Sequence, residues 1–144
     1  MAKLDNKVAL ITGAAAGLGK GIALVYAKYG AKCCLIDLDS IVLEKTAQEL
    51  RDSYQAEVIT FVGDVSKKED MEAAVRETVK QFGSLDIACC NACVCQLAPF
   101  EEMSDQMRDF HIDVNIKGVW NTCQAVIQPM LRQRKGAIVI ASSV

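Results

Sequence analysis

Short apolar runs alternate with helical patterns along the whole chain. We expect five apolar segments to be strands. They are residues 8–11, 33–36, 58–62 and 137–141, and the segment from Leu85 to Cys90, whose charge-free part comes after Asp86. Their hydrophobicity is continuous instead of alternating, which suits strands covered on both faces. Strands that alternate with helices predict an α/β fold of the doubly wound, parallel-sheet type.

Two helical patterns separate the first three runs. The first has large apolar residues on one stripe, which we expect to pack on the sheet: Leu18, Ile22, Val25, Tyr26 and Tyr29. The second pattern has a weaker stripe with the same expected role: Leu43, Ala47 and Leu50.

Two further helical regions follow. Residues 66–69, Ser-Lys-Lys-Glu, read as a capping box, and Gly83 is the expected stop of that helix. Its apolar positions have helical spacing: Met71, Ala74, Val75, Thr78, Val79 and Phe82. Residues 104–134 form either two helices or one bent helix, with Pro129 expected to break or kink it.

Composition narrows the class of protein. With 144 residues, 51% of them hydrophobic, the chain is expected to form one domain. The net charge of −2, with lysines and arginines spread along the helices, argues against a nucleic-acid partner. No apolar run approaches the roughly 20 residues that span a bilayer, and residues 1–7 lack the apolar stretch of a signal peptide. We therefore expect a cytoplasmic protein without a membrane partner.

Seven cysteines, an odd number without a secretion signal, predict reduced thiols. Four of them crowd one strand end: Cys89, Cys90, Cys93 and Cys95. The Cys90-Asn91-Ala92-Cys93 segment leaves a redox pair or half a zinc site open. A zinc site needs a second ligand pair, and the single histidine, His111, has none at ligand spacing. We expect no metal, and small buried side chains as the role of these cysteines.

A glycine-rich turn follows the first predicted strand and opens a helix. It carries Thr12, Gly13, Gly17, Leu18 and Gly19. Residues without side-chain bulk let the backbone approach a pyrophosphate at the helix N-terminus. The spacing does not fit a P-loop, because Lys20 precedes a glycine instead of Ser or Thr. Plain tight packing of a strand against a helix is the alternative reading of the turn.

Asp37 stands at the end of the second predicted strand, followed by Leu38. A carboxylate there can accept hydrogen bonds from an adenosine ribose, and its charge would repel a 2′-phosphate. Neither Ala16 nor Leu38 supplies an arginine for such a phosphate. The expected cofactor is therefore NAD; the alternative for Asp37 is a solvated residue at a strand end.

Together these residues make the chain resemble the N-terminal part of the short-chain dehydrogenase/reductase family over essentially all of its length. The turn is similar to the family's T-G-x-x-x-G-x-G. Gly63-Asp64-Val65, Cys90-Asn91-Ala92-Cys93 and Gly136 to Val144 stand, in the family's order, where its adenine-contacting aspartate, its N-N-A-G segment and its serine strand occur. The resemblance implies a Rossmann-type sheet with strand order 3-2-1-4-5, and residues 1–144 as an NAD-binding Rossmann domain.

The resemblance also implies roles for single residues. Asp64 and Val65 would meet the adenine, and Asn91 and Ala92 would belong to the cofactor site, with Asn91 bonding neighbouring backbone. Cys90 and Cys93 depart from N-N-A-G, and the Cys93 side chain puts the local geometry in doubt.

Two catalytic residues are implied. Asn115 matches the asparagine that holds a water in the family's proton relay; its alternative role is to bend a helix. Ser143, with Ser142 as neighbour, matches the hydroxyl that polarises the substrate, and helix capping is its alternative. The family's Tyr-x-x-x-Lys motif does not occur in the printed sequence, so we expect the site to be incomplete and the C-terminal part of the family fold to be lacking.

The expected function is NAD-dependent interconversion of an alcohol and a ketone by hydride transfer. The sequence is similar to bacterial generic oxidoreductases and hydroxysteroid dehydrogenases of the family. Its partners would be a small alcohol or ketone and, in the complete protein, further copies of itself in a dimer or tetramer. The alternative is a catalytically inactive dinucleotide-binding or interaction module.

Overall fold

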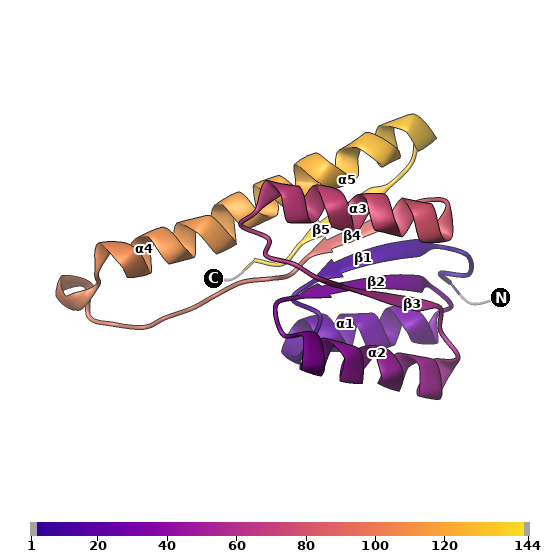
Figure 1. Ribbon diagram of the computed structural model, residues 1–144, viewed down its shortest axis with the longest axis horizontal. Coiled ribbons are helices and arrows are strands. Elements are labelled where there is room, and N and C mark those ends of the chain that lie inside the picture. The colour runs from indigo at the N-terminus through magenta and orange to yellow at the C-terminus, as the bar shows by residue number, and fades with distance from the viewer. Residues whose placement is uncertain (1–2, 143–144) are drawn as a thin grey trace.

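The computed structural model describes residues 3–142, which form a five-stranded parallel sheet. Its strands are β1 (Val8–Thr12), β2 (Lys32–Asp37), β3 (Val58–Val62), β4 (Ile87–Cys90) and β5 (Ala137–Ile140). The order is β3-β2-β1-β4-β5 (Figure 1). Both the doubly wound sheet and its predicted strand order are confirmed.

Helices cover both faces of the sheet. They are α1 (Gly17–Lys28), α2 (Ser40–Tyr54), α3 (Lys68–Phe82), a short 3₁₀ turn η1 (Phe100–Glu102), α4 (Asp105–Ile112), the π-helical η2 (Asp113–Gly118) and α5 (Val119–Gln133). Figure 1 shows α1 and α2 on one face, and α3 and α5 on the other. The helices that connect successive parallel strands therefore cover the two faces of the sheet.

Two buried clusters explain the continuous apolar runs. Along β1, Leu10 packs in the cluster with α3 and α5, while its neighbour Ile11 packs in the cluster with α1 and α2. In β2, Cys34 and Leu35 divide in the same way. Successive side chains of a strand point to opposite faces, so a strand buried on both faces has no position that faces solvent.

The predicted stripe of α1 is partly wrong. Leu18 and Val25 are 67% and 49% exposed. The residues of α1 that the sheet buries are Gly19, Ala23 and Ala27, with Ile22 and Tyr26 packed beside them. Small residues face the sheet because the backbone of α1 approaches the turn after β1 closely, a constraint that hydrophobicity alone does not reveal.

The predicted capping box of α3 is wrong, although the helix and its end are confirmed. The helix begins one residue later than the box requires, with Lys67 at the N-cap and no side chain capping it. The hydroxyl of Ser66 instead donates to the Asp64 carboxylate at 2.7 Å. Gly83 ends the helix in the left-handed conformation, with φ of +82°.

The last helical region is one long rod, residues 105–133, made of α4, η2 and α5 in succession (Figure 1). Ser104 caps its start by accepting from the Met107 amide at 3.2 Å. α5 continues through Pro129 to Gln133, so the proline does not end the helix. The irregularity lies instead at η2, a π-helical stretch within the rod. We call residues 105–133 the helical rod.

Candidate functional site

The strand order reverses at β1, which pairs with β2 on one side and with β4 on the other. In open parallel sheets, the crevice at the carboxyl ends of the strands beside such a switch point is the usual ligand site. A cleft of about 930 Å³ lies there. Its walls come from the β1–α1 turn, the ends of β2, β4 and β5, the β3–α3 loop and the helical rod.

The β1–α1 turn needs its glycines. Gly13 and Gly17 adopt φ of +66° and +55°, the left-handed region that glycine enters at little cost. A Cβ on Gly19 would lie 2.0 Å from the carbonyl oxygen of Gly13. The first turn of α1 and the strand end are therefore in contact through their backbones.

The N-terminus of α1 is open to the cleft. No side chain caps its first turn, which also contains no acidic residue. By contrast, the carboxylate of Asp39 caps α2 by accepting from the amides of Ile41 and Val42 at 3.1 and 3.0 Å. The first amides of a helix have no intrahelical acceptor, and Gly17, which lines the cleft, has open space where its side chain would be. This turn can accept an anionic group such as a phosphate.

Asp37 is fixed at the end of β2 by backbone amides. Its Oδ2 accepts from the Ala15 amide at 3.0 Å, which joins the strand end to the glycine turn. Its Oδ1 accepts from the amides of Leu38 and Asp39 at 2.7 and 3.4 Å. A carboxylate has about four acceptor positions, so both oxygens retain capacity toward the cleft that Asp37 and Leu38 line.

Thr12 and Asn91 join the ends of β1 and β4. The buried Thr12 hydroxyl accepts from the amides of Asn91 and Ala92 at 3.0 and 3.1 Å. In return, the Asn91 amide group donates to the carbonyls of Thr12 and Gly13 at 3.1 and 3.3 Å. The expectation that Asn91 bonds neighbouring backbone is confirmed, and the floor of the cleft is a reciprocal hydrogen-bond network.

Asp64 and Val65, in the loop that follows β3, form one wall of the cleft. The Asp64 carboxylate accepts from the Ser66 amide through Oδ1 at 2.9 Å, and its own amide donates to Asp70 at 2.9 Å. Val65 is buried, with its carbonyl accepting from the Asn121 side chain at 3.0 Å. The loop after β3 is thus held on one side by α3 and on the other by the helical rod.

Asn115 lies in the π-helical η2 and faces the segment that leaves β4. Its Oδ1 accepts from the Val94 amide and its Nδ2 donates to the Val94 carbonyl, both at 2.8 Å. π-Helical turns are frequent at functional sites. The asparagine therefore hydrogen-bonds main chain outside its own helix, so bending of the helix by local bonding does not describe these two contacts.

The cysteines divide into two groups. Cys89 and Cys90 are buried as expected, but Cys93 and Cys95 are exposed, so that prediction is wrong for those two. The segment after β4 leaves the sheet, which removes the neighbours that would cover them. Burial, with the neighbouring Cys123 thiol, raises the pKa of Cys90 to about 12. Its sulfur lies 3.9 Å from that of Cys123, so the contact that Cys90 makes with a thiol lies outside the C-x-x-C segment.

Most predicted site residues meet at one cleft. Those that line it are Gly13, Gly17, Leu18, Asp37, Leu38, Asp64, Val65, Asn91, Ala92 and Asn115. Thr12 and Gly19 stand behind its wall, where they shape the turn and the floor. Ser142 lines the cleft, whereas Ser143 lies outside the described residues.

Sequence reasoning missed two side chains that support the site. The buried Thr46 hydroxyl on α2 donates to the Ala15 carbonyl at 2.7 Å and so holds the glycine turn. Its signal was a polar residue within an otherwise apolar helical stripe. His111, on the helical rod, accepts from the Gln96 amide at 2.8 Å. No pattern in the sequence marks that contact, because it joins a helix to an irregular segment.

Within residues 3–142, no cluster of three or more His, Cys, Asp or Glu side chains is arranged to hold a metal ion. Likewise, none of the helices in this part of the chain has the length and apolar character needed to cross a membrane.

The sheet order, the glycine turn and the carboxylate after β2 are the features of a Rossmann-type fold. The family model described as short chain dehydrogenase matches residues 7–144. The chain belongs to the short-chain dehydrogenase/reductase family.

Individual relatives agree with this assignment. The chain is 45% identical over 144 residues to oxidoreductase UcpA of Escherichia coli K12, matching 100% of this chain and 54% of that protein. Among solved structures, an alcohol dehydrogenase of Thermococcus sibiricus complexed with 5-hydroxy-NADP superimposes with a TM-score of 0.90 at 34% identity, covering 95% and 58% of the two chains. An NAD⁺-bound xylitol dehydrogenase does so with a TM-score of 0.94 at 30% identity, covering 98% and 54%.

The chain spans about half the length of the curated relatives it matches. What these matches establish is an oxidoreductase family, a Rossmann-type sheet and a family cofactor of the nicotinamide dinucleotide class.

Proposed function

We propose that residues 1–144 are the NAD-binding domain of an oxidoreductase that interconverts an alcohol and a ketone by hydride transfer. The choice of NAD over NADP depends on one observation, the position of Asp37. Its carboxylate is held by three backbone amides at the mouth of the cleft. A fixed negative charge there can accept from both hydroxyls of an adenosine ribose and repels a 2′-phosphate.

The remaining walls fit the other parts of a dinucleotide. The uncapped first turn of α1, at Gly17 and Leu18, suits the pyrophosphate. Asp64 and Val65 border the space beyond Asp37, where the adenine would lie. Asn91 and Ala92 border the opposite end, beside Asn115, where the nicotinamide would lie. The bound dinucleotide would supply the hydride acceptor or donor of the reaction.

The chain's own contribution to the reaction lies at that end. The Oδ1 and Nδ2 atoms of Asn115 both hydrogen-bond the backbone of Val94, so the side chain is held in place before any ligand binds. By resemblance, its part is to hold a water in a proton relay, and Ser143 is the hydroxyl that polarises the substrate oxygen. Ser142, two residues after the end of β5, lines the cleft. The substrate would be a small alcohol or ketone.

The test is selective binding of the reduced cofactor to the purified chain. We expect quenching of protein fluorescence on titration with NADH, and at least tenfold weaker binding of NADPH. Asp37→Ser removes the charge and both acceptors, so NADH binding should weaken about tenfold while NADPH binding improves. The sole tryptophan, Trp120, provides the signal together with the fluorescence of the cofactor.

Asp52→Ser is the matched control, because it removes an aspartate from the exposed side of α2, where its carboxylate accepts from the Gln48 side chain at 2.7 Å. It should leave both affinities unchanged. Equal affinity of the wild-type chain for NADH and NADPH would contradict the assignment of NAD. Failure to bind either cofactor would contradict the proposed domain.

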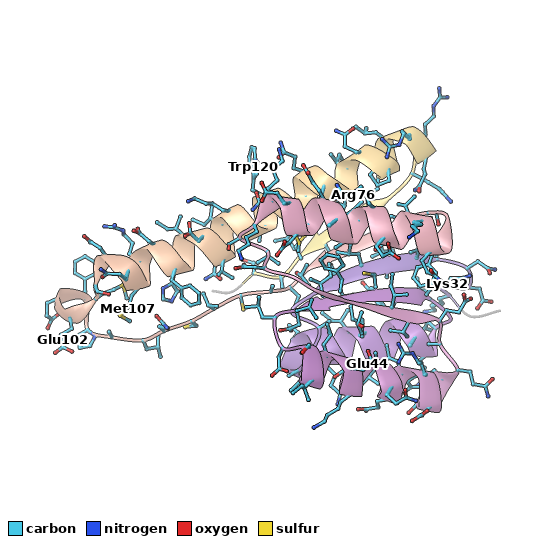
Figure 2. All side chains as sticks on the ribbon, viewed as in Figure 1. Lys32, Glu44, Arg76, Glu102, Met107 and Trp120 are labelled. Atoms are coloured by element: carbon cyan, nitrogen blue, oxygen red, sulfur yellow. The ribbon has the colours of Figure 1, made fainter. Side chains whose placement is uncertain are left out.

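The proposal extends to compartment and assembly. The seven cysteines are free thiols, which suits the reducing cytoplasm. The helical rod exposes apolar side chains, with Ile116, Trp120 and Leu131 at 64%, 69% and 64%. Figure 2 labels Trp120 on the rod. Exposed apolar surface of this kind marks interfaces, which supports a homo-oligomer; sedimentation of the purified protein at two concentrations tests it.

A further inference from the structure

The segment from Cys93 to Leu97 leaves β4 at the cleft and follows the helical rod (Figure 1). It belongs to no strand, yet its main chain is bonded at alternate residues. Asn115 bonds both the amide and the carbonyl of Val94. His111 accepts from the amide of Gln96 at 2.8 Å. Side chains of the rod thus take the place that a neighbouring strand has in a sheet.

The two side chains act from one face of the rod. His111 and Asn115 are four residues apart, the spacing that brings side chains to successive turns of the same helical face. The residues that they hold, Val94 and Gln96, are two apart, as on one edge of an extended chain. The match of spacings lets both contacts form at once.

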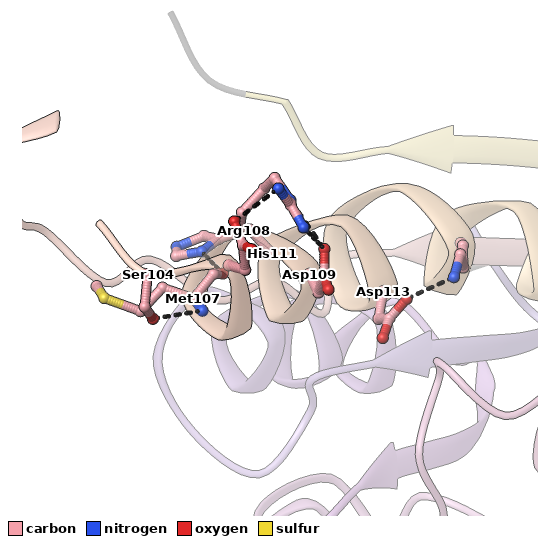
Figure 3. Close-up of polar contacts among 8 residues, drawn as sticks. Ser104, Met107, Arg108, Asp109, His111 and Asp113 are labelled. Atoms are coloured by element: carbon pink, nitrogen blue, oxygen red, sulfur yellow. Dashed lines mark hydrogen bonds and ion pairs between the residues drawn. The ribbon is translucent and has the colours of Figure 1, made fainter. Parts of the chain in front are cut away.

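The ring of His111 is oriented by its own helix. Its Nδ1 lies 2.6 Å from the carbonyl oxygen of Met107 (Figure 3). A carbonyl only accepts, so Nδ1 carries the proton of the neutral ring, and Nε2 is left as the acceptor for Gln96. Met107 is itself tied to the start of the rod, since its amide donates to the Ser104 hydroxyl at 3.2 Å. The helix cap, the ring and the segment therefore form one chain of hydrogen bonds.

This series of hydrogen bonds ends at the wall of the cleft. Cys93 and Val94 line the cleft beside Asn91 and Ala92, and the first residue after them that is tied to the rod is Gln96. Cys93 and Gln96 are exposed and Val94 is half-buried, so none of the three is held by complete burial. The position of this wall depends on the directional bonds from Asn115 and His111.

We infer that His111 is a positioning residue for the dinucleotide site: it keeps the Cys93–Leu97 segment against the helical rod, so that the cleft wall is formed before the cofactor binds. The inference rests on the proposed function. Without this hydrogen bond, cofactor binding must itself order the segment. The apparent affinity is then the intrinsic affinity multiplied by the fraction of molecules in which the wall is already formed. Loss of one hydrogen bond of ordinary strength corresponds to a decrease in affinity of about fivefold.

The first measurement is the protonation state of the ring by ¹⁵N NMR. His111 is the single histidine of the chain, so its two ring nitrogens give unambiguous signals. We expect the neutral ring to carry its proton on Nδ1 and the Gln96 amide to exchange slowly with solvent. A ring with its proton on Nε2, or an unprotected Gln96 amide, would overturn the inference. This result does not depend on any cofactor.

The second measurement compares NADH affinity between two substitutions. His111→Leu removes the acceptor and should weaken NADH binding about fivefold, with loss of protection at Gln96. His111→Gln restores a carbonyl acceptor of similar reach and should recover most of both. Gln106→Leu, an apolar substitution at an exposed position of α4, is the matched control and should change neither.

Wild-type affinity in His111→Leu would overturn the inference, as would a His111→Gln variant no better than His111→Leu. If the wild-type chain bound no dinucleotide, the proposed function would fail, while the ring protonation and the Gln96 exchange would still decide whether His111 holds the Cys93–Leu97 segment. Should His111→Leu not fold, the comparison of His111→Gln with wild type decides: a loss of affinity beyond fivefold would overturn the inference.

Discussion

Two regions of this molecule are held in place in different ways. In the body, residues 8–62, burial dominates: all five residues of β1 are buried, and β1 is paired on both sides. The helical rod is far more open. α4 has no buried residue, and Trp120 and Leu131 are 69% and 64% exposed.

The rod is tied instead by carboxamide side chains that bond main chain elsewhere. Asn121 donates to the carbonyl of Val65, and Gln133 bonds both the amide and the carbonyl of Leu85 at 3.0 and 2.9 Å. Asn115 holds the segment after β4 in the same manner. Burial is non-directional and supplies stability, whereas hydrogen bonds are directional and supply position. Substitutions in the two regions should therefore differ in kind as well as in size.

The largest difference is expected between two leucines. Leu10→Ala removes a fully buried side chain from the body and should lower the free energy of unfolding by about 3–4 kcal/mol. Leu131→Ala, at an exposed position of the rod, should change it by less than about 0.5 kcal/mol. Urea unfolding followed by circular dichroism measures both. Similar losses in the two variants would show that the rod is as much a part of the core as β1.

The next effect compares two glycines of α1. Gly19→Ala places a Cβ 2.0 Å from the Gly13 carbonyl oxygen, so the turn must shift, at a cost of about 2 kcal/mol. NADH binding should weaken at least tenfold because the shifted turn lines the cleft. Gly21→Ala meets no atom within 4 Å and should stabilise the helix by about 0.5–1 kcal/mol. Unfolding and NADH titration of both variants give the answer; equal behaviour would disprove the close contact.

A smaller and more local effect is expected at the far end of the rod. Gln133→Ala removes two hydrogen bonds to Leu85 and should cost about 1–2 kcal/mol. Hydrogen exchange should accelerate at the Leu85 amide more than at the amides of β1. Gln128→Ala, at an exposed position of the same helix, is the control and should alter neither. A uniform acceleration across the sheet would mean that the rod and the body open together.

The smallest effect depends on pH and concerns Asp86, which joins the start of β1 to Lys135, in the segment that follows the helical rod. Burial alone would raise the pKa of this carboxyl, but the Val8 amide and the ammonium groups of Lys135 and Lys7 outweigh burial and lower the pKa. A pKa lowered by folding stabilises the protein above the unfolded value of about 3.9, and that stability is lost as pH falls through the folded value.

As pH falls to about 4, Asp86 should lower the free energy of unfolding by less than about 1 kcal/mol. Below that pH, the decrease should become larger. Unfolding free energies of the wild type and Asp86→Asn across this range measure it, with the exposed Asp52→Asn as control. The wild-type curve should fall more steeply than that of Asp86→Asn. Parallel curves would remove Asp86 from the account of acid stability.

The fold was predictable from the sequence because strand burial on both faces leaves a direct mark. The continuous apolar runs located all five strands of the described sheet, and the resemblance supplied their order. The face of α1 was not predictable in the same way. There, close backbone contact demands Gly19, Ala23 and Ala27, and the larger Leu18 and Val25 are left in solvent.

The site was predictable where main-chain geometry dictates residue type. Gly13 and Gly17 have positive φ, and Asp37 follows a strand that ends at the cleft, so each carries a signal in the sequence. The supports of the site were not predictable. The bond from Gln96 to His111 joins segments with no regular relation, and the π-helical η2 arises within an unbroken helical pattern.

The parallel ladder of β1 also has a consequence for the order of events during synthesis. Ala9 pairs with Cys33 on one side and with Ile87 on the other. The first partner leaves the ribosome long before the second, so one edge of this fully buried strand waits without a neighbour while α2, β3 and α3 are made. Pairings between distant segments form slowly, and an uncovered strand edge can template association with other chains. We therefore expect nascent chains that stop before β4 to be the ones that chaperones retain.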